Sequence, residues 1–398
     1  MGARAIRGAR RAVLVTATVA VSLVPLGPRA TAGGGAARVV PSSLNPSSTE
    51  NKLNGVNAVS GTNAWAVGEY VDDTTHAHDT LILHWNGTKW SKVTSPNPGT
   101  QYNVLQAVRA VSAQNAWAVG NYVDDQGAYR TLILHWNGTK WSQVASPHPS
   151  STQSYLLGVN GGGSQGPARA VGYYEDDTSH GFRTLAAHWT GSKWVLDSTP
   201  SPASTNNYLG GVREPAASNA WAVGEDQTVG GLETLILHWN GTKWSRVTSP
   251  NGPDIESALA STSGASPSNG WAVGDYGDGA DYFTLILHWN GTKWTRVDSP
   301  SPSAIDNELH SVRATSTTDA WAVGTFISGP GVYDTLIEHW NGHAWSVVVS
   351  PNPSATTNFL NAVVSTSATN AWAVGYDYDS PVYHTLILHW NGHTWVQQ

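Results

Sequence analysis

An all-β fold is predicted for this chain by three observations: tryptophans recur at a regular spacing, each period holds four short β-rich segments, and an Asn-Gly turn joins the last two. The period is 50 to 53 residues and occurs seven times between residue 53 and residue 398. The middle segments are apolar at successive positions, so both faces of each four-stranded antiparallel sheet are expected to be covered. Seven such sheets without a distinct cap favour a closed ring, the seven-bladed β-propeller.

Three series of aromatic positions define the repeat. The first follows the block A-W-A-V-G, at Trp65, Trp117, Trp221, Trp271, Trp321 and Trp372, with Arg169 in the third unit. The second begins H-W-N-G-x-x-W, at Trp85, Trp136, Trp189, Trp239, Trp289, Trp340 and Trp390. The third lies five residues later, at Trp90, Trp141, Trp194, Trp244, Trp294, Trp345 and Trp395. Together they account for all 20 tryptophans.

The four segments of the first unit are residues 53–59, 64–70, 80–85 and 88–93. Each is too short for a useful helix and is bounded by Gly, Pro, Asn or Ser, which indicates strands. Asn86-Gly87 predicts a type I′ turn between the third and fourth strands. That turn would place Leu83 opposite Trp90, with Trp85 diagonal to it, so that two tryptophans brace every hairpin.

The two ends of the chain differ from the repeat. Residues 1–32 combine a basic start, an apolar run and the small-residue ending Ala30-Thr31-Ala32, the pattern of a signal peptide. Residues 33–52 form an N-terminal segment, and residues 53–398 form a single propeller domain. Residues 39–46 (V-V-P-S-S-L-N-P) echo the exit from the fourth strand at residues 347–353. We therefore expect this segment to help complete the last blade and close the ring.

Composition and charge limit the partners. With no cysteine there is no disulfide, thiolate metal site or cysteine nucleophile. Removal of residues 1–32 takes away five arginines and no acids, which leaves 16 basic against 28 acidic residues, a net charge of −12. Such a surface does not suit nucleic acid. No later segment is apolar enough to span a membrane, so we expect a secreted, extracellular monomer.

Candidate binding residues lie on one face of the disc. The loops joining strands 2 to 3 and 4 to 1 vary between units, whereas the turns on the other face are stereotyped. An aspartate stands four residues after the repeat glycine in five units, at Asp72, Asp124, Asp176, Asp278 and Asp379. These aspartates either start turns by binding their own backbone or form a ring of sites for sugar hydroxyls. No metal site or cofactor is predicted, although Ca²⁺ is the ion their oxygens would suit.

Aromatic and basic residues add to this set. Tyr70, Tyr122, Tyr174 and Tyr276 precede the 2–3 loops, and Tyr129, Tyr282 and Tyr383 are among the residues that follow them. They either pair across the hairpin or stack on sugar rings. Arg169 stands where the other units have tryptophan. This departure indicates either sequence divergence of one copy of the repeat or a local pocket in the third unit. The histidine before each second-series tryptophan is expected to be buried and bonded to the adjacent blade.

The repeated blocks L-I-L-H-W-N-G-T-K-W-S and A-W-A-V-G resemble the Trp-rich repeats of secreted bacterial β-propeller proteins. The G-x-x-W of Gly87 and Trp90 is similar to the second half of the Asp-box hairpin of sialidase-type propellers. The resemblance covers nearly all of residues 40–398 and implies the fold. Leu83 and Trp85 stand where an Asp box begins with Ser and Asp, so no sialidase residue is carried over.

The sequence favours a secreted carbohydrate- or surface-binding propeller with several similar sites on the variable face. A glycoside hydrolase or polysaccharide lyase with one asymmetric site is the first alternative, and a structural or protein-interaction module is the second. Several ligands per chain would support the first interpretation. Product release that depends on a few loop carboxylates would support the hydrolase or lyase.

Overall fold

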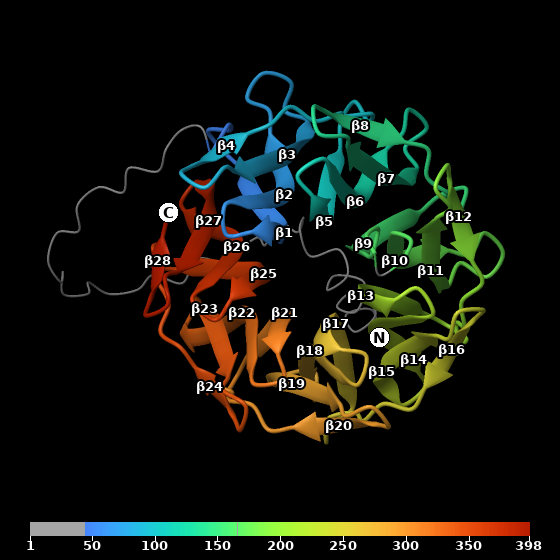
Figure 1. Cartoon of the computed structure of the whole chain (residues 1–398), viewed down its shortest axis with the longest axis vertical. Coiled ribbons are helices and arrows are strands. Elements are labelled where there is room, and N and C mark those ends of the chain that lie inside the picture. The colour runs from blue at the N-terminus through green and yellow to red at the C-terminus, as the bar shows by residue number, and fades with distance from the viewer. Residues whose placement is uncertain (1–43, 165) are drawn as a thin grey trace, which may run out of the picture.

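The computed structural model describes residues 44–164 and 166–398, and within them the protein is a disc of seven sheets around one axis (Figure 1). The predicted signal peptide, residues 1–32, and residues 33–43 lie outside the described residues. The described residues form 28 strands and no helix, so none of their segments is a helix able to span a bilayer. The prediction of an all-β, seven-bladed propeller with four antiparallel strands per blade is confirmed.

The strands follow the repeat in order. The first strands are β1 (Asn51–Ser60), β5 (Asn103–Ser112), β9 (Ser154–Asn160), β13 (Asn207–Ala216), β17 (Glu256–Ser266), β21 (Asn307–Ser316) and β25 (Thr357–Ser367). The second strands are β2 (Asn63–Val71), β6 (Asn115–Val123), β10 (Arg169–Glu175), β14 (Asn219–Thr228), β18 (Asn269–Gly277), β22 (Asp319–Gly329) and β26 (Asn370–Asp379). The third strands are β3 (His78–Trp85), β7 (Tyr129–Trp136), β11 (Phe182–Trp189), β15 (Gly231–Trp239), β19 (Tyr282–Trp289), β23 (Val332–Trp340) and β27 (Val382–Trp390). The fourth strands are β4 (Trp90–Lys92), β8 (Trp141–Val144), β12 (Trp194–Asp197), β16 (Trp244–Val247), β20 (Trp294–Val297), β24 (Trp345–Val347) and β28 (Trp395–Gln397).

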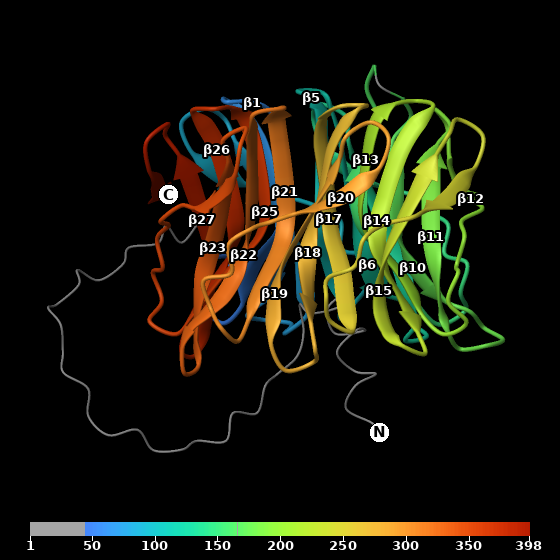
Figure 2. The same ribbon diagram turned by 90° about the horizontal axis from the view of Figure 1, so that it is seen from below.

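Each blade runs outward from the axis. Its first strand is innermost and its fourth strand lies at the rim (Figure 1). The 1–2 and 3–4 turns meet on one face, where the Trp85 indole Nε1 donates to the Gly61 carbonyl at 3.1 Å. The 2–3 and 4–1 loops gather at the opposite face (Figure 2). On that face, short parallel bridges such as His78 to Tyr102 link the third strand to the next blade at five of the seven interfaces of the described residues.

The predicted geometry of the 3–4 hairpin is wrong. Trp85 pairs directly with Trp90 and Leu83 pairs with Lys92, so the loop has four residues instead of two. Only Gly87 has a positive φ, of 95°. The Asn86 side chain accepts hydrogen bonds from the backbone amides of residues 88 and 89, both at 3.0 Å. Because this side chain closes the turn, Asn86 itself has no need of a left-handed conformation.

The tryptophans pack between blades as well as within them. Trp65 of blade one lies 4.9 Å from Trp136 and 5.2 Å from Trp141 of blade two, measured between ring centroids, with Trp141 edge-on. The same triplet recurs at five further interfaces, including that between blades seven and one. Offset or edge-on aromatic pairs contribute about 0.5–1.5 kcal/mol beyond the area they bury. The repeat tryptophans therefore hold the blades to one another.

The repeat histidines support this packing from inside their own blade. His84 lies 4.3 Å from Trp65 of the same blade, and its Nε2 lies 3.2 Å from the Asn63 side-chain oxygen. The expectation that these histidines are buried and bond the adjacent blade is wrong, because they are half-buried and bond within their own blade. The reason is register: His84 and Trp65 are direct cross-strand partners, so the imidazole covers the indole of its own sheet.

Residues 44–50 lie against the last blade. The Asn45 side-chain oxygen accepts from the Thr385 backbone amide at 2.7 Å, as Asn97 accepts from Thr80 at 2.8 Å within blade one. Glu50 forms a parallel bridge with Tyr383 of β27. Residues 44–50 precede blade one in the chain. On blade seven they take the position that the connection from strand 4 to the next strand 1 takes on the other blades.

Trp321→Ala tests the contribution of an inter-blade tryptophan. Trp321 is 1% exposed, so its removal leaves a cavity against Trp390 and Trp395 and should lower the free energy of unfolding by about 3–5 kcal/mol. Urea unfolding followed by circular dichroism measures the change. Val349→Ala, at a 90% exposed position, is the control and should stay within about 0.5 kcal/mol of wild type. A loss below about 1 kcal/mol for Trp321→Ala would contradict the interpretation.

Candidate functional site

The predicted loop aspartates make the hydrogen bonds of turn residues. Asp72 Oδ1 accepts from the backbone amides of Thr74 at 2.9 Å and Thr75 at 2.8 Å. Asp124, Asp176 and Asp278 accept from loop amides in the same way. These amides lower the pKa of each carboxyl, so all four stay charged in mildly acidic solution. They stabilise the loop ends, and the second oxygen of Asp124 is in addition paired with Arg130.

A tyrosine two residues before the aspartate lies beside it in four blades. The pairs are Tyr70 with Asp72, Tyr122 with Asp124, Tyr174 with Asp176, and Tyr276 with Asp278. A cation from strand 3 or 4 joins each pair. Lys92 Nζ stands 3.8 Å from the Tyr70 ring centroid, and Arg130 Nε lies 2.7 Å from Asp124 Oδ2. Each of these blades thus carries an aromatic ring, a carboxylate and a base near its 2–3 loop.

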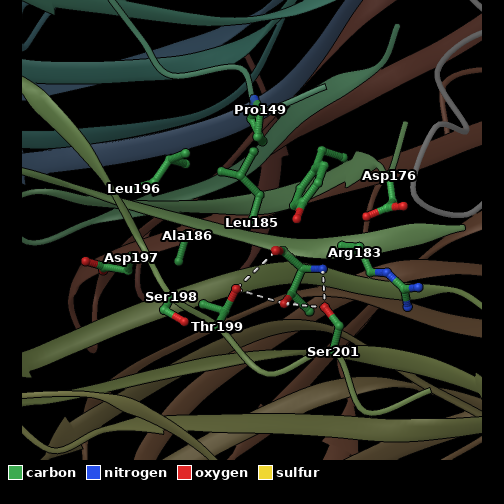
Figure 3. A pocket seen from close by; sticks show the side chains of 12 residues that line it. Pro149, Asp176, Arg183, Leu185, Ala186, Leu196, Asp197, Ser198, Thr199 and Ser201 are labelled. Carbon is green, nitrogen blue, oxygen red and sulfur yellow. Dashed lines mark hydrogen bonds between the residues drawn. The ribbon is translucent and has the colours of Figure 1, made fainter. Parts of the chain in front are cut away.

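In blade three this group lines a pocket of about 310 Å³ (Figure 3). Tyr174, Asp176 and Arg183 come from the two sides of the 2–3 hairpin, and Asp197 comes from the end of β12. Pro149 enters from the connection that precedes the blade. Arg183 is held by its Nη1, which donates to the Ala203 carbonyl at 3.1 Å. The sequence signal for Tyr174 was its fixed offset, two residues before the aspartate in four blades. Arg183 carried no such signal, because the cations of the other blades stand at different offsets from their aspartates.

The three predicted tyrosines lie elsewhere, at the start of third strands on the axial side. Tyr129 packs on Tyr155, with ring centroids 5.2 Å apart. The Tyr282 hydroxyl donates to Glu256 Oε2 at 2.6 Å. Tyr383 lies under Lys52 Nζ, which is 4.3 Å from its ring centroid. The structure therefore does not bring these tyrosines together with the aspartates.

Arg169 occupies the tryptophan position at the interface between blades three and four and is 3% exposed. Its guanidinium stacks on Trp239 at 4.3 Å, and its Nη1 and Nε pair with Asp197 at 2.9 Å and Glu214 at 3.2 Å. The Glu214 carboxylate lies close to Gly161, and a Cβ at that position would lie 2.4 Å from its Oε2. A glycine at residue 161 therefore leaves room for the Glu214 carboxylate beside Arg169. Arg169 thus faces the core and not the pocket, which it touches only through Asp197.

Asp197 was not predicted, although it replaces the valine found at this position in several blades. Its Oδ1 lies 2.6 Å from His188 Nδ1, and its Oδ2 accepts from Trp244 Nε1 at 3.1 Å. With Arg169, three groups hold this carboxylate in place. Its position at the pocket wall is therefore fixed, and its charge is already balanced.

Two groups of side chains in the described residues offer three metal-ligand atoms within 4.8 Å of one another: Glu50, Glu69 and His78, and Asp377, Asp379 and His384. Each group includes a histidine nitrogen. Calcium prefers oxygen ligands in larger number, so neither set fits the calcium that the loop aspartates suggested. Asp379 belongs to the second group, which sets it apart from the other four loop aspartates.

Comparison with known proteins identifies the fold. No family model matches the chain, and no curated protein matches its sequence. Among solved structures, an ulvan lyase described as a polysaccharide lyase bound to -[GlcA(1-4)Rha3S]- is similar at a TM-score of 0.52 and 10% identity, covering 86% of this chain and 92% of that one. The β-propeller domain of the Trilobed protease from Pyrococcus furiosus gives a TM-score of 0.51 at 7% identity, covering 87% and 96%. At these identities the likeness establishes the β-propeller fold alone.

Glu338 is a second departure from the repeat and occupies a core position that is leucine in most blades. Neither of its carboxylate oxygens has a hydrogen-bond partner, and burial raises its pKa from 4.5 to about 8. The folded protein therefore holds a proton here that the unfolded chain releases above pH 4.5. This difference lowers the stability progressively as the pH rises from 4.5 to about 8.

Glu338→Leu should accordingly raise the free energy of unfolding, by roughly a few kcal/mol at pH 8 and by less at pH 5. Denaturant titrations at the two pH values measure both gains. Glu338→Gln, which cannot ionise, is the matched control and should lose the same pH dependence while keeping a buried polar group. Equal gains for Glu338→Leu at pH 5 and pH 8 would show that the carboxyl does not titrate as described.

Proposed function

We propose that this chain is a secreted carbohydrate-binding β-propeller with several similar sites on the face that carries the 2–3 and 4–1 loops. The pocket of blade three supports this proposal most directly. Its volume of about 310 Å³ is at the lower end of the roughly 300–1,000 Å³ of small-molecule sites. That size suits one or two sugar units.

The chemistry of the pocket supports a sugar ligand. An aromatic ring such as that of Tyr174 offers a flat apolar face to the C–H groups of a pyranose. Asp176 accepts hydrogen bonds, and Arg183 donates them. The recurrence of a tyrosine, an aspartate and a base in blades one, two and five supports more than one site per chain.

Binding is favoured over catalysis by the state of the carboxylates. A glycoside hydrolase needs one carboxyl that stays protonated near neutral pH beside one that is charged. Asp176 has its pKa lowered by backbone amides, and Asp197 is engaged by Arg169, His188 and Trp244. Asp176 therefore stays charged, and both oxygens of Asp197 are already bonded within the protein.

Isothermal titration with a panel of plant and cell-wall oligosaccharides tests the proposal. Wild type should bind more than one ligand per chain. Tyr174→Ala and Asp176→Ala should each remove one site and leave the others, because the other blades are independent. Asp125→Asn, which changes an exposed acid on the neighbouring blade, is the control and should bind as wild type.

Two outcomes would contradict the proposal. One is the absence of binding across the whole panel. The other is release of shortened products that stops when Asp176 or Asp197 is replaced, which would make the chain an enzyme with one site.

A further inference from the structure

One buried carboxylate of blade one lacks a partner for one of its oxygens. Glu69 lies on β2, directly after the repeat glycine, and is 0% exposed. Its Oε2 lies 3.0 Å from His78 Nδ1, whereas its Oε1 is buried and has no hydrogen-bond partner among the described residues. A buried carboxylate oxygen without a partner is costly, so a bound group outside the chain is expected to meet it.

Two further side chains bring ligand atoms to this carboxylate. Glu50 precedes β1, and His78 begins β3. Glu50, Glu69 and His78 each offer one oxygen or nitrogen, and these three atoms lie within 4.8 Å of one another. Glu225 of blade four and Asp275 of blade five stand at the position of Glu69, but neither belongs to such a group within the described chain. The arrangement is therefore particular to blade one.

The distances within the group suit a metal ion. Zinc lies about 2.0–2.2 Å from its nitrogen and oxygen ligands, so two neighbouring ligand atoms are roughly 3.0–3.5 Å apart. His78 Nδ1 and Glu69 Oε2 already have this separation, at 3.0 Å. The Glu50 side chain is 20% exposed, so its carboxylate has room to adjust towards an ion.

One imidazole and two carboxylates select the class of ion. Calcium and magnesium prefer oxygen ligands alone, whereas nitrogen together with oxygen suits divalent transition metals such as zinc. Lys52 Nζ pairs with Glu50 Oε1 at 2.8 Å and holds this carboxylate from one side. With both carboxylates ionised, two negative charges against one ammonium still leave a net negative charge for a divalent cation.

The group lies where the two ends of the chain meet. The Glu50 carbonyl accepts from the Val71 amide of blade one at 3.0 Å, and Glu50 forms a bridge with Tyr383 of blade seven. Successive side chains of a strand point to opposite faces of the sheet, so Tyr70 leaves β2 on the face opposite Glu69. The group is therefore separate from the tyrosine and aspartate beside the 2–3 loop of blade one.

We infer that Glu50, Glu69 and His78 form a binding site for one divalent transition-metal ion, with Zn²⁺ as the best fit. Glu50 bridges to blade seven, while Glu69 and His78 belong to the β2–β3 hairpin of blade one. A bound ion thus cross-links the segment that closes the ring to the first blade, and it stabilises the closed ring. The site does not depend on the proposed sugar sites.

Titration of the full chain with ZnCl₂, after removal of metal with EDTA, tests the inference. Wild type should bind one ion at this group, and its melting temperature should rise saturably with zinc. Glu69→Gln and His78→Asn should each weaken binding by about tenfold or more. Glu308→Gln is the matched control and should bind as tightly as wild type, because it removes a carboxylate that lies 3.2 Å from His310 without a third ligand.

The effect of zinc on the melting temperature separates a ligand from a residue that only supports the fold. Loss of a supporting residue would lower the melting temperature equally with and without zinc. Glu69→Gln, at a buried position, and Glu50→Gln, at a partly exposed one, should instead lose the rise that zinc gives to wild type. An undiminished rise in both variants would overturn the inference.

Co²⁺ reports the site directly, because its visible absorption changes when protein ligands replace water. The spectrum of bound Co²⁺ should be lost in His78→Asn and kept in His384→Asn, which alters the other group of three ligand atoms. Absence of zinc binding by wild type would overturn the inference, and so would loss of binding in His384→Asn alone. Tyr174→Ala should leave zinc binding unchanged, so failure of the sugar sites and failure of this site are distinguishable.

Discussion

The packing of tryptophans across blade interfaces is the interaction on which the rest of the structure depends. A single four-stranded sheet of this length cannot bury both of its faces, and the chain has no cysteine to cross-link it. Trp65 packs against Trp136 and Trp141 of the next blade. Trp372 of blade seven packs in the same way against Trp85 and Trp90 of blade one, which closes the ring. Because each blade is covered by its neighbours, the 2–3 and 4–1 loops are free to vary without loss of the core.

The repeat was sufficient to predict the fold from the sequence, because a period near 50 residues with four short apolar segments leaves few alternatives. Local geometry was harder. The prediction of a two-residue turn at Asn86 was wrong. The Asn86 side chain accepts hydrogen bonds from the turn amides, and the resulting four-residue loop places Trp85 directly opposite Trp90. The predicted partner of His84 was wrong for a related reason. Strand register, and not spacing along the sequence, decides that Trp65 of the same blade lies beside its imidazole.

The candidate site could be predicted only in part. The offset of Asp176 from the repeat glycine placed it on the 2–3 loop, but the separation of the aspartates from Tyr129 and Tyr282 depends on which way each side chain leaves the sheet. Arg169 stood out in the sequence, yet its burial against Trp239 depends on Asp197 and Glu214, which lie 28 and 45 residues away along the chain. A residue that departs from a repeat marks a changed environment, and only the structure says whether that environment is core or surface.

Departures from the repeat share a physical character, because most of them place an ionisable group where other blades have apolar or neutral side chains. Arg169 and Glu214 pair with each other, Glu338 has no hydrogen-bond partner for its carboxyl among the described residues, and the buried Nε of Arg313 has none either. An unbalanced buried charge reduces stability and is retained only where something offsets the loss.

The contacts of Asn45 and Glu50 with the last blade have a consequence for biosynthesis. Asn45 binds Thr385, and Glu50 pairs with Tyr383, so residues made early bind residues made more than 330 positions later. Blades two to six can assemble against their neighbours as they emerge, but the join between the two ends waits for the final 50 residues. A ribosome-bound chain that lacks these last residues would therefore be an open ring with two uncovered blade edges, and the ring can close only once they have emerged.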